Sequence, residues 1–250
     1  MIEIKTEKEI ALIEKASRIV AETLLLVKEN AKAGVSTLYL DRIAYENIIK
    51  NKAKPAFLGY RGFPATCCIS VNEEVIHGIP SDKKILKEGD LVSVDIGSVY
   101  DGYYGDAAIS FIIGRSKSPE HEKLLEICEK SLYKGLNEIK DGAKLGDVSY
   151  AIGDFVFKNN MDVLREFTGH GIGRRLHEEP SIFNYGVKNT GPVLREGMTL
   201  AVEPMIVLGK ADVDFKEDKW TVVTRDGSYS AHFEHTVVVT KKGYKILSRI

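Results

Sequence analysis

Apolar residues recur at helical spacing in the first part of the chain, behind a pattern that starts helices. Thr6 and Glu9 have the spacing of a capping box, and Gly34 provides a stop signal. The apolar positions between them are Ile10, Ile13, Val20, Leu24 and Val27. The sequence therefore predicts one helix that opens at Thr6 and is stopped by Gly34. A second helix is predicted from Ser36 to about Lys50.

The same order of signals returns later in the chain. Ser118 followed by Pro119 is typical of a helix start, and Gly142 is the next stop. The apolar positions between them are Leu124, Cys128, Leu132, Leu136 and Ile139. Another helix is predicted from Leu145 to about Asn159. The two stop glycines lie 108 positions apart, which indicates an internal repeat.

Two alternating segments, typical of strands, repeat at the same offset of 108. Leu86–Gly89 leads into Leu91–Asp95, and Leu194–Gly197 leads into Thr199–Glu203, so that a carboxylate follows each glycine by six positions. A looser similarity relates His77–Pro80 to His170–Gly173 at an offset of 93. Coincidence is the alternative, because two helices followed by strands are a common order. We interpret the chain as one α+β domain, residues 1–250, with pseudo-twofold halves near 1–117 and 118–250.

Composition limits what such a domain can be. With 35 basic and 36 acidic side chains the net charge is -1, which leaves no strong field for nucleic acid or an anionic membrane. The three cysteines cannot all pair and lack zinc-finger spacing, so a reducing compartment is expected. The N-terminus has no apolar signal region, and the longest aliphatic cluster is far below the ~18 residues of a membrane span. We expect a cytoplasmic protein.

A pair of aspartates lies on the predicted hairpin in the first half. The dipeptide Asp101-Gly102 favours a two-residue turn between strands 91–100 and 103–113, in a register that places Asp95 opposite Ala108. Asp95 and Asp106 then become diagonal neighbours on one face. One of them could simply face water. Their neighbours are apolar, however, and unpaired buried carboxylates are costly, so a cation between the two is the favoured interpretation.

The second half offers complementary ligands. Glu203 ends a strand before Pro204, Glu234 lies in an apolar strand, and His170 lies among three glycines that allow close backbone approach. A lone His among glycines is more often a turn residue than a ligand. Two Asp, two Glu and one His nevertheless form a set suited to two divalent ions bridged by shared acids and a water.

These motifs make the chain similar to the type I methionine aminopeptidases, compact members of the pita-bread (creatinase/aminopeptidase) metallopeptidase superfamily. The stretches that carry the resemblance are His77–Pro80, Val94–Gly97 with Gly105–Asp106, Thr168–Gly173, His177–Pro180, Gly197–Met205 and Phe233–Thr236. The similarity runs from Ile4 to the final strand without a large insertion. It implies helices that cover a curved, mainly antiparallel sheet. It also implies removal of the initiator methionine from nascent proteins when the second residue is small.

The resemblance also implies roles for individual residues. Its metal ligands fall on Asp95, Asp106, His170, Glu203 and Glu234, the set already selected from the residues themselves. His77 matches a histidine that contacts the substrate amide, and His177 one that steadies the carbonyl oxygen. The positions that match the pocket for the first side chain are Tyr60, Phe63, Cys68, Leu176 and Trp220. Core packing is the ordinary alternative for such aromatic and Cys positions.

Catalysis is expected to follow from charge. Two divalent ions would lower the proton affinity of a bridging water, and Glu203 is the predicted proton shuttle to the leaving amine. Co, Mn, Fe and Zn all suit the ligands, so the sequence leaves the physiological metal open. A soft, aromatic pocket suits the methionine thioether.

Three positions depart from the family pattern or are ambiguous. Leu176 stands where an aromatic is common, so this wall of the pocket is expected to be wider or softer. His232 stands where the family more often has Gln, and could hydrogen-bond a metal-binding acid or tune its proton affinity. His235, of opposite strand parity, should point away from Glu234 and support a ligand from behind.

Two other functions remain open. Aminopeptidase P and prolidase use the same five ligands on Xaa-Pro substrates, but usually carry a further N-terminal domain, whereas this chain begins directly in the catalytic fold. A non-catalytic pita-bread protein would typically lose metal ligands, and all five are present. A monomer is expected because no long apolar stripe or heptad repeat is visible. Transient contact with the ribosome is implied by the family role alone.

Overall fold

A nine-stranded antiparallel sheet forms the centre of the molecule. The computed structural model describes residues 2–249. The strand order is β1-β4-β5-β14-β9-β7-β8, with β2 also paired to β4 and β15 to β14. These strands are β1 (Lys54–Pro55), β2 (Cys67–Val71), β4 (Leu91–Tyr100), β5 (Tyr103–Ile112), β7 (Gly169–Gly171), β8 (Glu178–Ile182), β9 (Thr199–Val202), β14 (Glu234–Thr240) and β15 (Gly243–Ile246). The expected α+β pita-bread architecture is confirmed.

Two small three-stranded sheets flank the large one. One contains β6 (Asp162–Val163), β10 (Met205–Val207) and β13 (Ser230–His232), and the other β3 (Glu74–Ile76), β11 (Val213–Phe215) and β12 (Val222–Thr224). Their strands belong to segments that connect strands of the large sheet in the sequence, and most of these segments lie in the second half of the chain. They extend the structure around one end of the central sheet.

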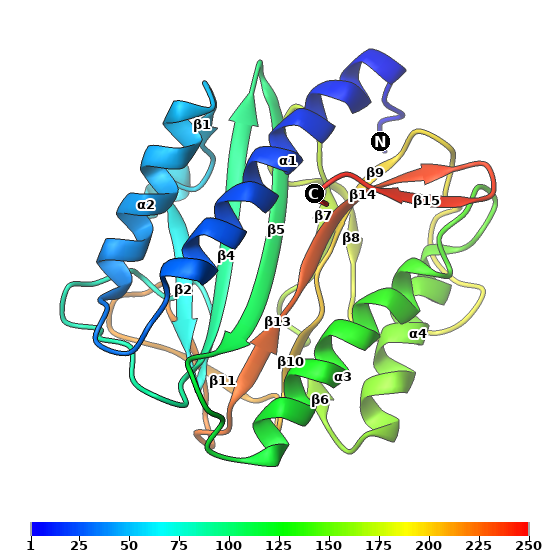
Figure 1. Cartoon of the computed structure of the whole chain (residues 1–250). Coiled ribbons are helices and arrows are strands. Elements are labelled where there is room, and N and C mark those ends of the chain that lie inside the picture. The colour runs from blue at the N-terminus through cyan, green and yellow to red at the C-terminus, as the bar shows by residue number, and fades with distance from the viewer. Residues whose placement is uncertain (1, 250) are drawn as a thin grey trace.

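Four long helices cover one face of the central sheet (Figure 1). They are α1 (Glu7–Asn30), α2 (Thr37–Lys50), α3 (Pro119–Leu136) and α4 (Leu145–Lys158). Helix α1 packs on β4 and β5, α2 packs on α1, and α3 packs on α4. The other face is therefore left for side chains that the helices do not bury. Within residues 2–249, no helix is both long enough and apolar enough to span a membrane.

The helix starts agree with the predicted caps, whereas two helix ends lie earlier than predicted. Thr6 and Glu9 form the complete capping box, and Ser36 accepts a hydrogen bond from the Tyr39 amide. Helix α1 ends at Asn30, and α3 ends at Leu136 although the apolar spacing predicts a helix that includes Ile139. Ile139 is still fully buried, because a tight turn after α3 carries it into the same core. The apolar residue at position 139 therefore reflects burial and not a continued helix.

The central hairpin has the predicted register. Asp95 pairs with Ala108 and Gly97 with Asp106. Asp101 and Gly102 both have positive φ, +48° and +80°, as a type I′ turn requires. Because the turn has only two residues, the strands cannot shift relative to each other. The turn therefore fixes the face of the sheet on which Asp95 and Asp106 lie.

Matching contacts recur 108 positions apart. The Gly34 amide donates to the Leu86 carbonyl at 2.8 Å, and the Gly142 amide donates to Leu194 at 2.9 Å. Isolated bridges join Ser36 to Ile85 and, at the same offset, Lys144 to Val193. Both glycines have positive φ, +90° and +85°. These contacts support the single domain with a repeat that we propose, in which residues 1–117 are the N-terminal half and 118–250 the C-terminal half.

Candidate metal centre

Asp95 and Asp106 lie near the middle of the central sheet, on the face that the helices do not cover. Asp106 is buried, and the neighbouring strand β14 fixes its backbone. The Asp106 amide donates to Thr236 Oγ1 at 3.1 Å, and the Thr236 hydroxyl donates to the Asp106 carbonyl at 2.7 Å. Asp95 and Glu234 both pair with Ala108, from opposite sides. The small alanine leaves the space between these two carboxylates open.

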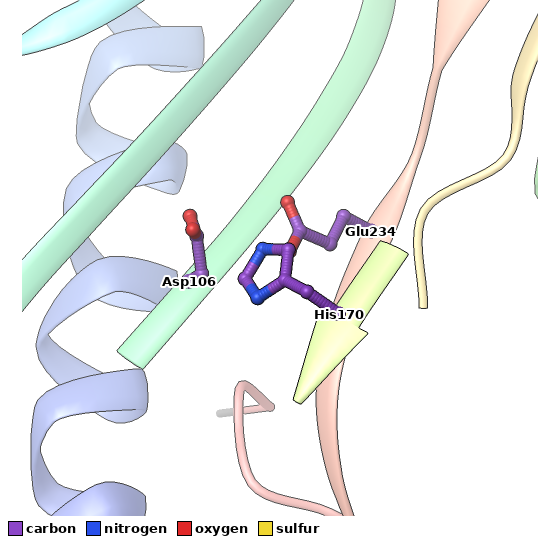
Figure 2. Close-up of side chains that lie close together, drawn as sticks. All are labelled: Asp106, His170 and Glu234. Carbon is purple, nitrogen blue, oxygen red and sulfur yellow. The ribbon is translucent and has the colours of Figure 1, made fainter. Parts of the chain in front are cut away.

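Strands of the second half bring the other predicted ligands to the same place. His170 lies on β7 opposite Ala201 of β9, and Glu203 directly follows β9. Figure 2 shows the side chains of Asp106, His170 and Glu234 turned towards one another. One ligand atom from each of these three residues lies within 4.8 Å of the other two. Five side chains from both halves therefore converge on one space.

The carboxylates at this space are unpaired and poorly solvated. Asp95 Oδ1, Asp106 Oδ1 and Glu234 Oε1 are buried, and none has a hydrogen-bond partner among residues 2–249. Burial raises the pKa of Asp95 to about 7. Burial also raises the pKa of Glu203, and burial with the nearby charge of Asp106 raises that of Glu234. Such a cluster is costly unless cations neutralise it. Hard oxygen ligands with an imidazole fit a divalent metal.

Glu203 lies between two histidines. His170 Nε2 is 3.4 Å from Glu203 Oε1, and His232 Nε2 is 3.5 Å from Glu203 Oε2. His170 Nδ1 lies 2.9 Å from the Gly171 carbonyl, which can only accept, so Nδ1 donates. Burial, and then the neighbouring His177, lower the pKa of His170 to about 3. The ring is therefore neutral at neutral pH, and its Nε2 lone pair is available to a metal.

A cavity of about 270 Å³ opens beside the cluster. Its lining includes all five predicted ligands, Asp95, Asp106, His170, Glu203 and Glu234, and also His77, His177, Tyr60, Phe63, Cys68 and Trp220. Of the predicted pocket residues, Leu176 alone is not among the lining residues. It is buried and packs with Phe63 and Cys68 in the apolar cluster behind the cavity wall. Its effect on the pocket would be indirect.

The two other histidines are held at the cavity by aromatic rings. Tyr60 Oη lies 2.8 Å from His177 Nδ1, and His77 contacts Phe167 and Trp220 edge-on. His77 has a φ of +57°, a conformation that non-glycine residues seldom adopt. Burial lowers the pKa of His77 to about 4. Burial and Arg61 lower the pKa of His177, so both rings are neutral.

Sequence reasoning missed three residues of the lining, Phe57, Arg61 and Phe167. Arg61 lies in the 3-10 turn Tyr60–Gly62, at a positive φ of +49° that no sequence pattern predicted. Phe167 directly precedes the glycine loop of His170, which was a usable signal. The sequence indicates only a supporting role for His232, yet this residue forms a second candidate ligand group with Glu203 and Glu234.

His235 points away from the cluster, as expected from strand parity. Its Nδ1 lies 2.9 Å from Ser248 Oγ, and the same oxygen accepts from the Thr236 amide at 3.1 Å. Thr236 in turn binds the backbone of Asp106. His235 therefore contributes to a chain of hydrogen bonds that reaches one predicted ligand from behind.

Known proteins resemble this chain over its whole length. The sequence profile of metallopeptidase family M24 matches residues 11–241. Methionine aminopeptidase 1 of Bacillus subtilis is 48% identical over 250 residues, all of both chains. The crystal structure of methionine aminopeptidase from Thermotoga maritima has a TM-score of 0.98 at 46% identity, with complete coverage of both chains. The prolidase from Pyrococcus horikoshii has a TM-score of 0.78 at 26% identity, and the match covers 98% of this chain but 63% of the prolidase.

Proposed function

The chain belongs to metallopeptidase family M24, and we propose that the centre described above is where it removes the N-terminal methionine from peptides and proteins. The activity rests on the full-length similarity to methionine aminopeptidases. The single observation that carries the site is the convergence of five metal-binding side chains, with unpaired buried oxygens, at the edge of one cavity. The family's use of divalent metal fits these residues.

We propose that two divalent ions, of Co, Mn, Fe or Zn, are held by Asp95, Asp106, His170, Glu203 and Glu234. When bound, such ions polarise a substrate carbonyl and lower the proton affinity of a water between them. Glu203 accepts the proton of the attacking water and returns it to the leaving amine.

His177 and His77 orient the reacting peptide bond. If the Tyr60 hydroxyl donates to His177 Nδ1, the imidazole proton lies on Nε2, from which it can be donated to the carbonyl oxygen as negative charge develops there. His77 is neutral and lines the same cavity, where it contacts the substrate amide. Both assignments predict lower kcat on substitution rather than loss of metal.

The rest of the cavity binds the methionine side chain. Tyr60, Phe63, Cys68 and Trp220 give it an aromatic and sulfur-containing wall, and thioether–aromatic contacts add to apolar burial. Leu176 acts through Phe63 and Cys68 by its packing behind them. A preference for a small second residue follows the family.

The remaining assignments concern where the enzyme works. Its substrates are protein N-termini, and we propose that these are nascent chains in the cytoplasm, reached during transient contact with the ribosome by a monomeric enzyme. The near-zero net charge supports the absence of a general affinity for nucleic acid. Sedimentation of the purified protein alone would test the monomeric state, and sedimentation with ribosomes would test the ribosome contact.

A matched panel of three peptides tests the function. Purified protein with Mn(II) or Co(II) should release Met from Met-Ala-Ser, release little from Met-Lys-Ser, and leave Ala-Pro-Ser intact. A chelator should stop the reaction. Cleavage of Ala-Pro-Ser instead would assign the chain to the prolidase-like branch, and no release with any metal would contradict an enzymatic function.

A further inference from the structure

His232 is a buried side chain at the candidate metal centre for which the five-ligand scheme gives no role. It is 2% exposed and ends strand β13. Its backbone is fixed on both sides: the His232 amide donates to Ser110 Oγ at 2.9 Å, the Ser110 hydroxyl donates to the His232 carbonyl at 2.8 Å, and Met205 pairs with it from β10. The backbone that carries this imidazole is thus fixed close to Glu203 and Glu234.

The Nε2 atom of this ring has no hydrogen-bond partner in the part of the chain that the structure describes. A buried ring nitrogen is ordinarily satisfied, because an unpaired polar atom in the interior costs about 1–3 kcal/mol. The nearest acid oxygen, Glu203 Oε2, is 3.5 Å away, too long for a good hydrogen bond. The unpaired nitrogen therefore needs a partner that protein atoms do not supply.

Two geometric features indicate a metal as that partner. Ligand atoms of Glu203, His232 and Glu234 all lie within 4.8 Å of one another, and Glu234 also belongs to the group with Asp106 and His170. Two ligands about 2.1 Å from one ion lie roughly 3.0–3.4 Å apart. The separations of Glu203 from His232 and from His170, 3.5 Å and 3.4 Å, are close to that range and nearly equal.

We propose that His232 is a second imidazole ligand of the metal centre. Its Nε2 atom binds the ion that Glu203 and Glu234 hold. The inference rests on the proposed function, because it adds a sixth residue to the same centre. His170 and His232 then lie on either side of Glu203, and the centre has two nitrogen ligands. Imidazole favours Zn, Co and Fe over Mn, so the second ring shifts the metal preference of the centre away from Mn.

Nuclear magnetic resonance of the intact protein, loaded with cadmium-113 after labelling with nitrogen-15, tests the proposal. The chain has only six histidines, so the side-chain nitrogens can be resolved. A metal-bound nitrogen is split by its direct bond to cadmium. We expect split Nε2 signals from two rings, one lost in His170→Gln and the other in His232→Gln. His121→Gln is the matched control, because His121 lies on α3 outside both ligand groups, so that its ring is unsplit and both split signals should remain.

Metal affinity gives a second measurement that does not depend on turnover. His232→Gln should weaken Zn(II) binding about 10–100-fold in calorimetric titration, and Mn(II) binding less. His232→Asn serves as the second variant if His232→Gln does not fold, and the wild-type spectrum needs no variant at all. A split signal from His170 alone would overturn the role of His232 and leave the proposed centre intact. Failure to bind any divalent metal would overturn the centre itself.

Discussion

The N-terminal half carries its two acids on one hairpin, whereas the C-terminal half supplies His170, Glu203 and Glu234 from separate strands. A two-residue turn joins β4 to β5. In the second half β9 also pairs with β14, but the connection between them is long. It consists of residues 203–233, which build most of the small sheets. The repeated elements therefore build the frame, and the interruption brings in His232 and Trp220. The two halves share the elements that support the site, and they differ in the segments that supply its functional side chains.

The strand pairing also shows which positions correspond. Ser70 pairs with Ser93 in the first half, and His170 pairs with Ala201, which lies 108 positions after Ser93. His170 thus occupies the place that Ser70 has in the first half. The looser similarity between the His77 and His170 segments is not a structural equivalence, because His77 follows the end of β3, whereas His170 lies within β7. The short common pattern His-Gly-Ile arose in two different structures.

The largest expected effect comes from the C-terminal half. Glu203→Gln keeps the shape of the side chain but removes the carboxylate that accepts the proton, so kcat should fall about 10³-fold or more. Circular dichroism and the thermal midpoint should show a folded protein. The exposed helix residue Glu129→Gln is the control and should leave turnover unchanged. Near-normal turnover by Glu203→Gln would remove it both as shuttle and as ligand.

Asp95→Asn tests the N-terminal hairpin. It should weaken Mn(II) binding by at least about 10–100-fold and lower the number of ions bound. It should also stabilise the metal-free protein, because it removes one charge from a crowded, buried cluster. Calorimetric titration and denaturant unfolding measure the two effects. Unchanged metal stoichiometry would show that the hairpin acid is not a ligand.

The pH dependence of the metal-free protein should show the same crowding. The pKa of Asp95 is raised from 3.8 to about 7, so the folded state binds this proton more tightly than the unfolded state. The free energy of unfolding of metal-free protein should therefore fall as pH rises from about 4 to about 7. Saturating Mn(II) should reduce or reverse this slope, because metal binds the deprotonated acids. A slope that is the same with and without metal would contradict the shared cluster.

The smallest effects test the repeat. Gly34→Ala and Gly142→Ala each place a side chain at positive φ, where the added carbon meets nothing within 4 Å. Each should lower the free energy of unfolding by about 1 kcal/mol through backbone strain alone. Neither should change metal affinity. A large difference between the two losses would contradict equivalent roles in the two halves.

Local signals predicted most of the frame. Capping residues fixed the helix starts and the Asp101-Gly102 turn fixed the hairpin register, because each acts through neighbours in sequence. The end of α3 was predicted wrongly because Ile139 is buried without being helical. Boundaries that depend on packing by distant segments have no local signal.

The candidate site was predictable to a lesser extent. Four acids on predicted strands and one histidine among glycines indicated a metal centre, and the structure brings all five together. The lining position of Arg61 and the indirect position of Leu176 depend on how loops fold over the sheet. The unpaired Nε2 of His232 is visible only in the structure, where Ser110 fixes the His232 backbone and Glu203 Oε2 lies 3.5 Å from that nitrogen.

One measurement tests the central claim that both halves build a single metal-dependent aminopeptidase centre. Metal-free protein is titrated with Mn(II), and bound metal and Met released from Met-Ala-Ser are measured in the same samples. We predict no release without metal, and release that rises with bound metal in the wild type and is absent in Glu203→Gln. Undiminished release by protein shown to contain no metal would contradict the account.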